Sequence, residues 1–159
     1  MFMVDEHYQI TQPTSQFFAA QLITQQWAQP KDIDHRLFAA SSDVKDSEGH
    51  VLVTAYALER PDEQWSLMLI NKDFDSAHQV RIKFRNAEVN RVTSFAGPVV
   101  MITFGKAQYQ WHPNRKQGYA DPDNPPVTST LAANEETLYN LPAASLNVVR
   151  GNLIAVKGP

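Results

Sequence analysis

Cysteine is absent from these 159 residues, and glycine occurs only six times. Without cysteine the chain has no disulfide framework, zinc–thiolate site or cysteine nucleophile, and its redox compartment stays open. With so few glycines it also lacks the Gly-rich loops that cradle phosphate groups. No apolar run approaches the ~20 residues that a membrane-spanning helix needs. These absences exclude whole classes of site before any motif is considered.

The sequence also has no large excess of positive or negative charge. The net charge is −3, the pI is about 5.9, and no block of like charges occurs, which argues against a nucleic-acid-binding protein. The first residues include Asp5 and Glu6, where a signal peptide would carry lysine or arginine. The chain as written therefore shows no export signal, while a signal upstream in a longer parent leaves its location open. At this length, with 43 % hydrophobic and 19 % charged residues, we expect one ordered domain with a substantial core.

The first thirty residues predict one helix. Pro13, Thr14 and Ser15 form a plausible helix start, and the pattern runs through residues 16–27 and stops before Pro30. Its large apolar side chains cover most of the helix circumference, so we expect cover on more than one side. They form a candidate partner-helix interface, which either folds back on the rest of the chain or packs against the same helix of a second copy. The residues are Phe17, Phe18, Leu22, Ile23 and Trp27.

From His35 onward the pattern is that of β-strands. Residues 51–58 and 65–70 are largely apolar, and residues 78–85 alternate strictly between apolar and polar side chains. Further strands are expected at 99–104, 127–131, 138–139 and 144–149. The predicted fold is mainly β, an antiparallel β-sandwich with one N-terminal helix, divided into residues 1–30 and 31–159. The expected core comprises Val53, Ala55, Trp65, Leu67, Leu69, Val80, Ile82, Phe84, Ile102, Leu146 and Val148.

No catalytic constellation is visible. A glycosidase needs two carboxylates that face each other about 5–10 Å apart, whereas most acids here fall in predicted turns. There is no Gly-x-Ser-x-Gly elbow, and the five histidines lack the spacing of metal ligands. We therefore predict no catalytic residue, no metal site and no cofactor.

One segment, residues 108–126, is predicted to be a long proline-rich loop. It concentrates aromatic, histidine, amide and acidic groups, and long ordered loops often carry function. Its candidate residues for carbohydrate binding or for a domain interface are Tyr109, Trp111, His112, Tyr119, Asp121 and Asp123. Aromatic faces beside amides and carboxylates suit sugars. The alternatives are a plug at the end of the sandwich on a rigid connection, and a calcium site that uses Asp121 and Asp123.

Several segments together resemble the C-terminal region of bacterial glycoside hydrolases of the xylosidase and arabinofuranosidase type. Residues 17–27 resemble the last helix of the catalytic (β/α)₈ barrel in these enzymes. Residues 53–57, 65–73, 109–113, 120–123 and 141–151 resemble their β-sandwich, in the same order and spacing.

This resemblance implies that the barrel, with its catalytic glutamates, is missing from this chain, so no catalytic residue can be carried over. The leading hypothesis is a non-catalytic accessory or structural domain, whose partner is a catalytic barrel or a second copy of the chain. A carbohydrate-binding module, with Trp111 and Tyr119 as coplanar aromatics, is the alternative. An enzyme of unrecognised type is a third possibility. We expect no nucleic-acid or membrane partner.

Overall fold

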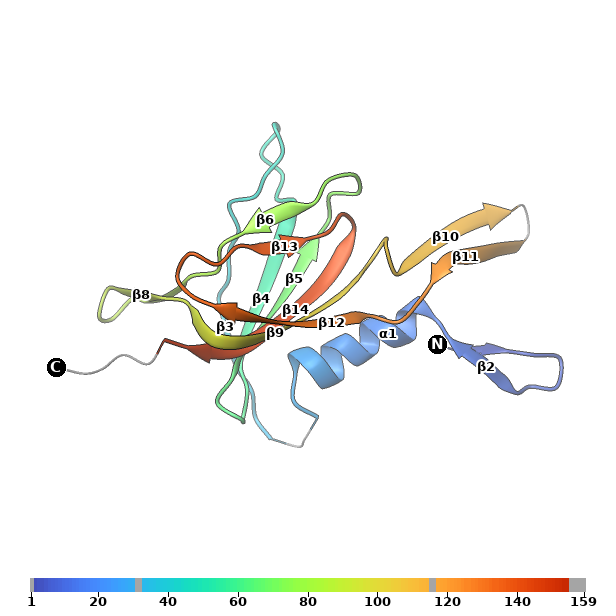
Figure 1. Ribbon diagram of the computed structural model, residues 1–159, viewed down its shortest axis with the longest axis horizontal. Coiled ribbons are helices and arrows are strands. Elements are labelled where there is room, and N and C mark those ends of the chain that lie inside the picture. The colour runs from blue at the N-terminus through green and yellow to red at the C-terminus, as the bar shows by residue number, and fades with distance from the viewer. Residues whose placement is uncertain (1, 31–32, 115–116, 155–159) are drawn as a thin grey trace.

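A computed structural model describes residues 2–30, 33–114 and 117–154 of the chain (Figure 1). Its centre is a six-stranded antiparallel sheet in the order β12-β9-β14-β5-β4-β3. The six strands are β3 (Arg36–Phe38), β4 (Val53–Glu59), β5 (Trp65–Asn71), β9 (Phe95–Gly105), β12 (Val127–Ala133) and β14 (Ser145–Leu153). Within the described ranges, no helix has the length and apolar character to cross a membrane.

Four two-stranded antiparallel sheets and one helix surround the central sheet. The strand pairs are β1 (Phe2–Val4) with β2 (Ile10–Pro13), β6 (His78–Val80) with β13 (Tyr139–Leu141), β7 (Phe84–Asn86) with β8 (Arg91–Thr93), and β10 (Tyr109–Asn114) with β11 (Gln117–Asp123). The helix begins as α1 (Ser15–Gln21) and continues as a π-helix, η1 (Leu22–Trp27).

The main core lies between one face of the central sheet and the segments that carry β6 and β13, which cross in front of the sheet in Figure 1. Alternate residues of β5, such as Leu67 and Leu69, point to this face because strand side chains alternate with a period of two. The buried members are Val53, Ala57, Leu67, Leu69, Ile82, Phe95, Val99, Met101, Ala133, Tyr139, Leu141 and Val149. Burial raises the pKa of the Tyr139 phenol to about 12, so this ring remains neutral in the core.

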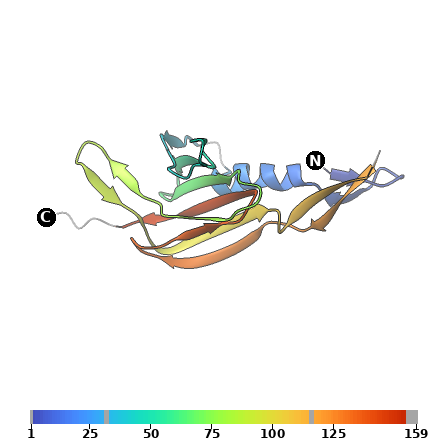
Figure 2. The same ribbon diagram turned by 90° about the horizontal axis from the view of Figure 1, so that it is seen from above.

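The opposite face of the sheet is covered by the helix, which lies along one side of the sheet in Figure 2. Here Phe18 and Leu22 pack against Ile102, Phe104 and Val148. Residues from both sides of the predicted domain boundary therefore contribute to this second core. The predicted boundary itself falls at residues 29–32, of which Lys31 and Asp32 lie outside the described residues.

The structure confirms a mainly β, antiparallel fold with one helix. It also confirms much of the expected core. Val53, Leu67, Leu69, Ile82, Ile102 and Val148 are buried, and Ala55, Trp65, Val80, Phe84 and Leu146 are partly buried against the two cores.

Two predictions of local structure were wrong, and one hairpin was not predicted. Residues 78–85 form two short strands, β6 and β7, because each end pairs with a different partner, although the inward and outward alternation is kept. Residues 108–126 are largely the β10–β11 hairpin rather than a loop. The β1–β2 hairpin precedes the helix in a segment for which no strand was predicted.

Candidate functional site

The β10–β11 hairpin carries the six residues that the sequence singles out. Its register pairs Trp111 with Ala120 and His112 with Tyr119. Cross-strand partners share a face, and neighbours along a strand point to opposite faces. Trp111 and Tyr119 therefore lie on opposite faces of the hairpin, and they do not form one flat platform.

Each face of this hairpin has a different aromatic arrangement. On one face the His112 and Tyr119 rings stack, with centroids 5.2 Å apart and planes 20° apart, and His112 Nε2 donates to the carbonyl oxygen of Asp121 at 2.8 Å. On the other face the Trp111 indole lies directly against Gly118, where a Cβ atom would overlap the ring. Trp111 and Tyr119 are both more than half exposed.

Two other candidates, Tyr109 and Asp123, pair at the base of the hairpin, and each contacts another part of the chain. Tyr109 packs on the second core, with its ring centroid 6.3 Å from that of Phe104. Asp123 accepts a hydrogen bond of 2.7 Å from Gln12 Nε2 on β2. Among the residues that the structure describes, no group of three or more His, Asp or Glu side chains is placed to hold a metal ion.

The bond between Gln12 and Asp123 connects two hairpins that are distant in sequence. Both the β1–β2 and the β10–β11 hairpins extend from the same end of the molecule (Figures 1 and 2). Together they expose large hydrophobic side chains that neither core uses. We call this set the hairpin surface: Phe2, Met3, Val4, Tyr8, Ile10, Trp111 and Tyr119.

The predicted partner-helix residues face mostly inward in this single chain. Phe18 and Leu22 are buried in the second core. Phe17 packs beside Phe2, with ring centroids 5.0 Å apart, and Trp27 Nε1 donates to the carbonyl oxygen of Tyr56 at 3.3 Å. Ile23 is 39 % exposed and points outward.

Arg60, which the sequence analysis did not single out, holds the end of the helix. Its buried guanidinium donates from Nη1 to the carbonyl oxygens of Gln26 at 2.8 Å and Ala28 at 3.1 Å. It also forms an ion pair of 2.9 Å with Asp62. Carbonyl groups at a helix end lack partners within the helix, so a cation here satisfies them. The turn 60–63 was visible in the sequence, but the contact with residues 26 and 28 depends on the tertiary fold.

Three carboxylates, those of Asp46, Asp62 and Asp73, accept hydrogen bonds within turns. The side-chain hydrogen bond from His50 lowers the pKa of Asp46, and that from Arg60 lowers the pKa of Asp62. The backbone amides of residues 75 and 76, and then His78, lower the pKa of Asp73. A general acid needs a raised pKa, so these three groups are shifted in the opposite direction.

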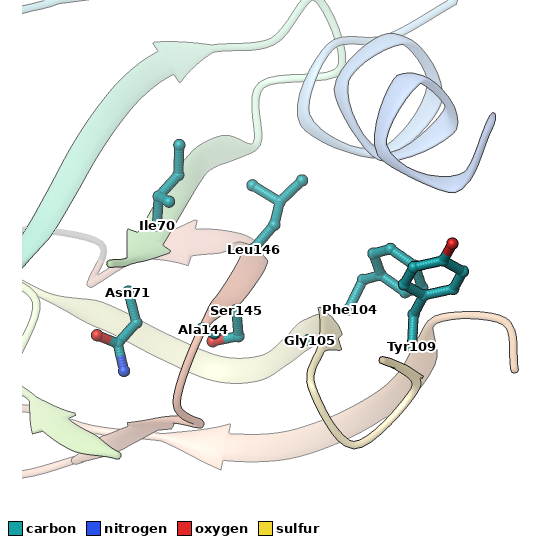
Figure 3. A pocket seen from close by; sticks show the side chains of 8 residues that line it. All are labelled: Ile70, Asn71, Phe104, Gly105, Tyr109, Ala144, Ser145 and Leu146. Atoms are coloured by element: carbon teal, nitrogen blue, oxygen red, sulfur yellow. The ribbon is translucent and has the colours of Figure 1, made fainter. Parts of the chain in front are cut away.

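A cavity of about 320 Å³ lies where the ends of β5 and β9 meet the starts of β10 and β14 (Figure 3). Ile70, Leu146, Phe104 and Tyr109 form its apolar lining. Asn71 and Ser145 border it from the other side of the strands, where their polar groups bond to nearby backbone. The cavity is thus an apolar space with one phenol at its edge, and its lining offers no nucleophile paired with a base.

Comparison with known proteins gives structural likeness only. No family model matches this chain, and no curated protein matches it. Among solved structures, the chain is similar to part of the GH51 α-L-arabinofuranosidase from Thermotoga petrophila RKU-1, with 15 % identity and a TM-score of 0.39 over 64 % of this chain and 19 % of that enzyme.

Two further arabinofuranosidases give similar values. For the enzyme from Thermotoga maritima the identity is 15 % and the TM-score 0.40, over 65 % of this chain and 20 % of that one. For the GH51 enzyme from Xanthomonas axonopodis pv. citri they are 14 % and 0.41, over 72 % and 21 %. The chain spans about a fifth of the length of these enzymes. Values this low do not establish membership of a family.

Proposed function

We propose that this chain is a non-catalytic accessory β-sandwich domain of a glycoside hydrolase, and that it supports a catalytic barrel by docking through the hairpin surface. The observation that carries this proposal is the pair of hairpins joined by Gln12 and Asp123, with large hydrophobic side chains exposed on both. The sequence resemblance to the sandwich of such enzymes supplies the identity of the partner.

The hairpin surface has the character of a protein interface. Val4, Tyr8 and Ile10 are 54 %, 87 % and 64 % exposed, on a two-stranded hairpin that reaches away from both cores. Large apolar side chains that gather on two neighbouring hairpins favour a contact with another protein. Aromatic residues such as Trp111 and Tyr119 are enriched at the centres of such contacts.

Two observations favour docking over the alternatives. The opposite orientation of Trp111 and Tyr119 deprives the hairpin of the coplanar aromatics that a carbohydrate-binding module requires. Self-association through the N-terminal helix would compete with the packing of Phe18 and Leu22 inside the same chain.

The first test examines the coding region just upstream and the activity of the purified chain. The proposal requires that this region encode a (β/α)₈ barrel. It also requires that the chain alone leave nitrophenyl xylosides, arabinosides and glucosides intact. Absence of an encoded barrel would contradict the proposal. So would hydrolysis that survives purification and disappears when an acid of this chain is replaced.

The second test measures association with that barrel, expressed as a separate chain. Ile10→Ser and Trp111→Ser should each weaken binding by about tenfold or more, because they remove central apolar contacts. Leu138→Ser is the matched control, because Leu138 is 51 % exposed but lies outside both hairpins. Unchanged binding by both hairpin variants, or no binding by the unaltered chain, would overturn the docking role.

A further inference from the structure

A second candidate site lies at the end of the molecule opposite the hairpin surface, near β8 in Figure 1. It is a groove of about 720 Å³ between the β7–β8 hairpin and the corner of the central sheet formed by β3, β4 and β5. This volume is within the range of small-molecule sites, roughly 300–1,000 Å³.

Aromatic rings line the groove. Trp65 on β5 has Phe38 on one side, with ring centroids 4.6 Å apart, and Phe84 on the other, at 5.0 Å. Phe38 is 37 % exposed and Trp65 is partly buried, so the lining is fixed to the main core yet remains accessible. The ring planes are tilted by 43° and 68° to one another, so they form an apolar wall rather than one flat platform, and the C–H face of a sugar ring can pack against one ring of this wall.

The sheet supplies a charged pair beside these rings. Arg36 Nη1 and Glu59 Oε2 are 2.9 Å apart, and the Arg36 guanidinium also lies over the Phe38 ring at 5.4 Å. Arg36 pairs with Glu59 and Glu59 pairs with Trp65 across the strands, so the three side chains share one face of the sheet. The groove therefore has a donor and an acceptor, joined in an exposed ion pair, next to its aromatic lining.

The β7–β8 hairpin supplies the polar groups opposite. Its register pairs Phe84 with Thr93 and Asn86 with Arg91, which places these four side chains on one face. Phe84 packs on Trp65, so this face looks toward the sheet corner. Arg85 and Glu88, from the same hairpin, also border the groove.

Two of these groups lack partners within the chain. Among the described residues, the Thr93 hydroxyl is buried with no hydrogen-bond partner, and no ion pair involves the exposed Arg91. A guanidinium with no internal carboxylate is suited to bind one from a ligand.

We propose that this groove binds a saccharide that carries a carboxylate, as a uronic acid does. The sugar ring would pack against the wall that includes Trp65 and Phe38. Its hydroxyl groups would bond to Glu59 and Asn86, and its carboxylate would bind Arg91. Because the groove and the hairpin surface lie at opposite ends of the molecule (Figure 2), this proposal does not depend on the docking role.

The experiment is a calorimetric titration of the full chain with two sugars, methyl glucuronide and methyl glucoside. These probes differ only in a carboxylate that replaces a hydroxymethyl group. The glucuronide should bind about tenfold more tightly than the glucoside, because a hydrogen bond between charged groups is stronger than one between neutral groups. Arg91→Gln should remove this difference by weakening the glucuronide alone.

Lys83→Gln is the matched control, with the same change of charge at an exposed position just before β7 that does not line the groove. It should leave both affinities unchanged, and circular dichroism should verify that both variants are folded. The proposal is overturned if the glucuronide does not bind at millimolar concentration or if both sugars bind equally. Equal losses in Lys83→Gln and Arg91→Gln would also overturn it, because they would indicate a diffuse effect of charge.

Discussion

Asn71 Nδ2 donates to the carbonyl oxygen of Pro142 at 2.8 Å, which connects the end of β5 to the turn before β14. The same amide group lies 3.2 Å from the carbonyl oxygen of Leu141, while its Oδ1 accepts from the Asp73 amide at 3.0 Å. The polar turn after β5 and the proline before β14 are therefore parts of one hydrogen-bonded junction.

Replacing Asn71 with alanine should destabilise the fold. Asn71 is 1 % exposed, and its removal would leave buried carbonyl groups without donors, at a cost of about 1–3 kcal/mol. Urea unfolding of the two proteins measures this difference. Asn140→Ala, an exposed position on β13, is the control and should change little. Equal stability of Asn71→Ala and the unaltered chain would show that the junction is not needed.

The packing of the helix on the sheet predicts a sharp contrast between two neighbouring residues. Leu22→Ala should cost about 2–5 kcal/mol, through lost burial and the cavity left behind, because Leu22 is 1 % exposed. Ile23→Ala, at 39 % exposure, should cost far less. Thermal unfolding compares the two variants, and similar losses in both would contradict this packing.

The burial of Phe18 and Leu22 in the second core also determines the expected effect of replacing them with a charged residue. If the helix served mainly to form a dimer, glutamate at Phe18 and Leu22 would give a folded monomer. Because both side chains lie in the second core, we expect these variants to lose their folded structure. Circular dichroism together with sedimentation separates the two results.

Replacing Arg60 with lysine should destabilise the fold. Its Nη1 donates to two carbonyl groups while its other nitrogens bond Asp62, and a single ammonium group cannot reproduce this fork. Arg60→Lys should cost about 1–3 kcal/mol and speed amide hydrogen exchange in η1. The control is Arg36→Lys. Arg36 forms an exposed ion pair with Glu59, so this substitution should change the free energy of unfolding by less than about 1 kcal/mol. Unchanged exchange in Arg60→Lys would show that Arg60 does not hold the helix end.

Acid should weaken the fold partly through Asp73. Its pKa in the folded chain is held below the ordinary value of 3.8, first by the amides of residues 75 and 76 and then by His78. A lowered folded pKa stabilises the fold above 3.8, and this contribution is lost as the pH falls through the folded value.

Asp73→Asn tests this contribution, because an asparagine oxygen can still accept both amide hydrogen bonds but carries no charge. Its stability should fall less steeply than that of the unaltered chain below pH 3.8, as measured by urea unfolding across an acid series. Parallel curves for the two proteins would show that the Asp73 charge contributes nothing.

The sequence by itself determined which segments are apolar and with what period. The alternation at residues 78–85 correctly assigned Ile82 inward and Arg81 and Lys83 outward, because side-chain period follows directly from strand geometry. The continuous apolar surface of residues 16–27 likewise predicted a helix that needs cover. These features are local, so one chain segment is enough to specify them.

Only the tertiary structure decided which segments pair. Residues 78–80 and 84–86 join different partners, and prolines that suggested a loop at 108–126 instead occur in a hairpin. The bonds of Asn71 to Pro142, Arg60 to Ala28 and Gln12 to Asp123 span 32 to 111 positions. The groove with Arg91 likewise exists only because β7–β8 stands over a corner of the sheet. Such contacts depend on the summed packing of the whole chain, which no local pattern contains.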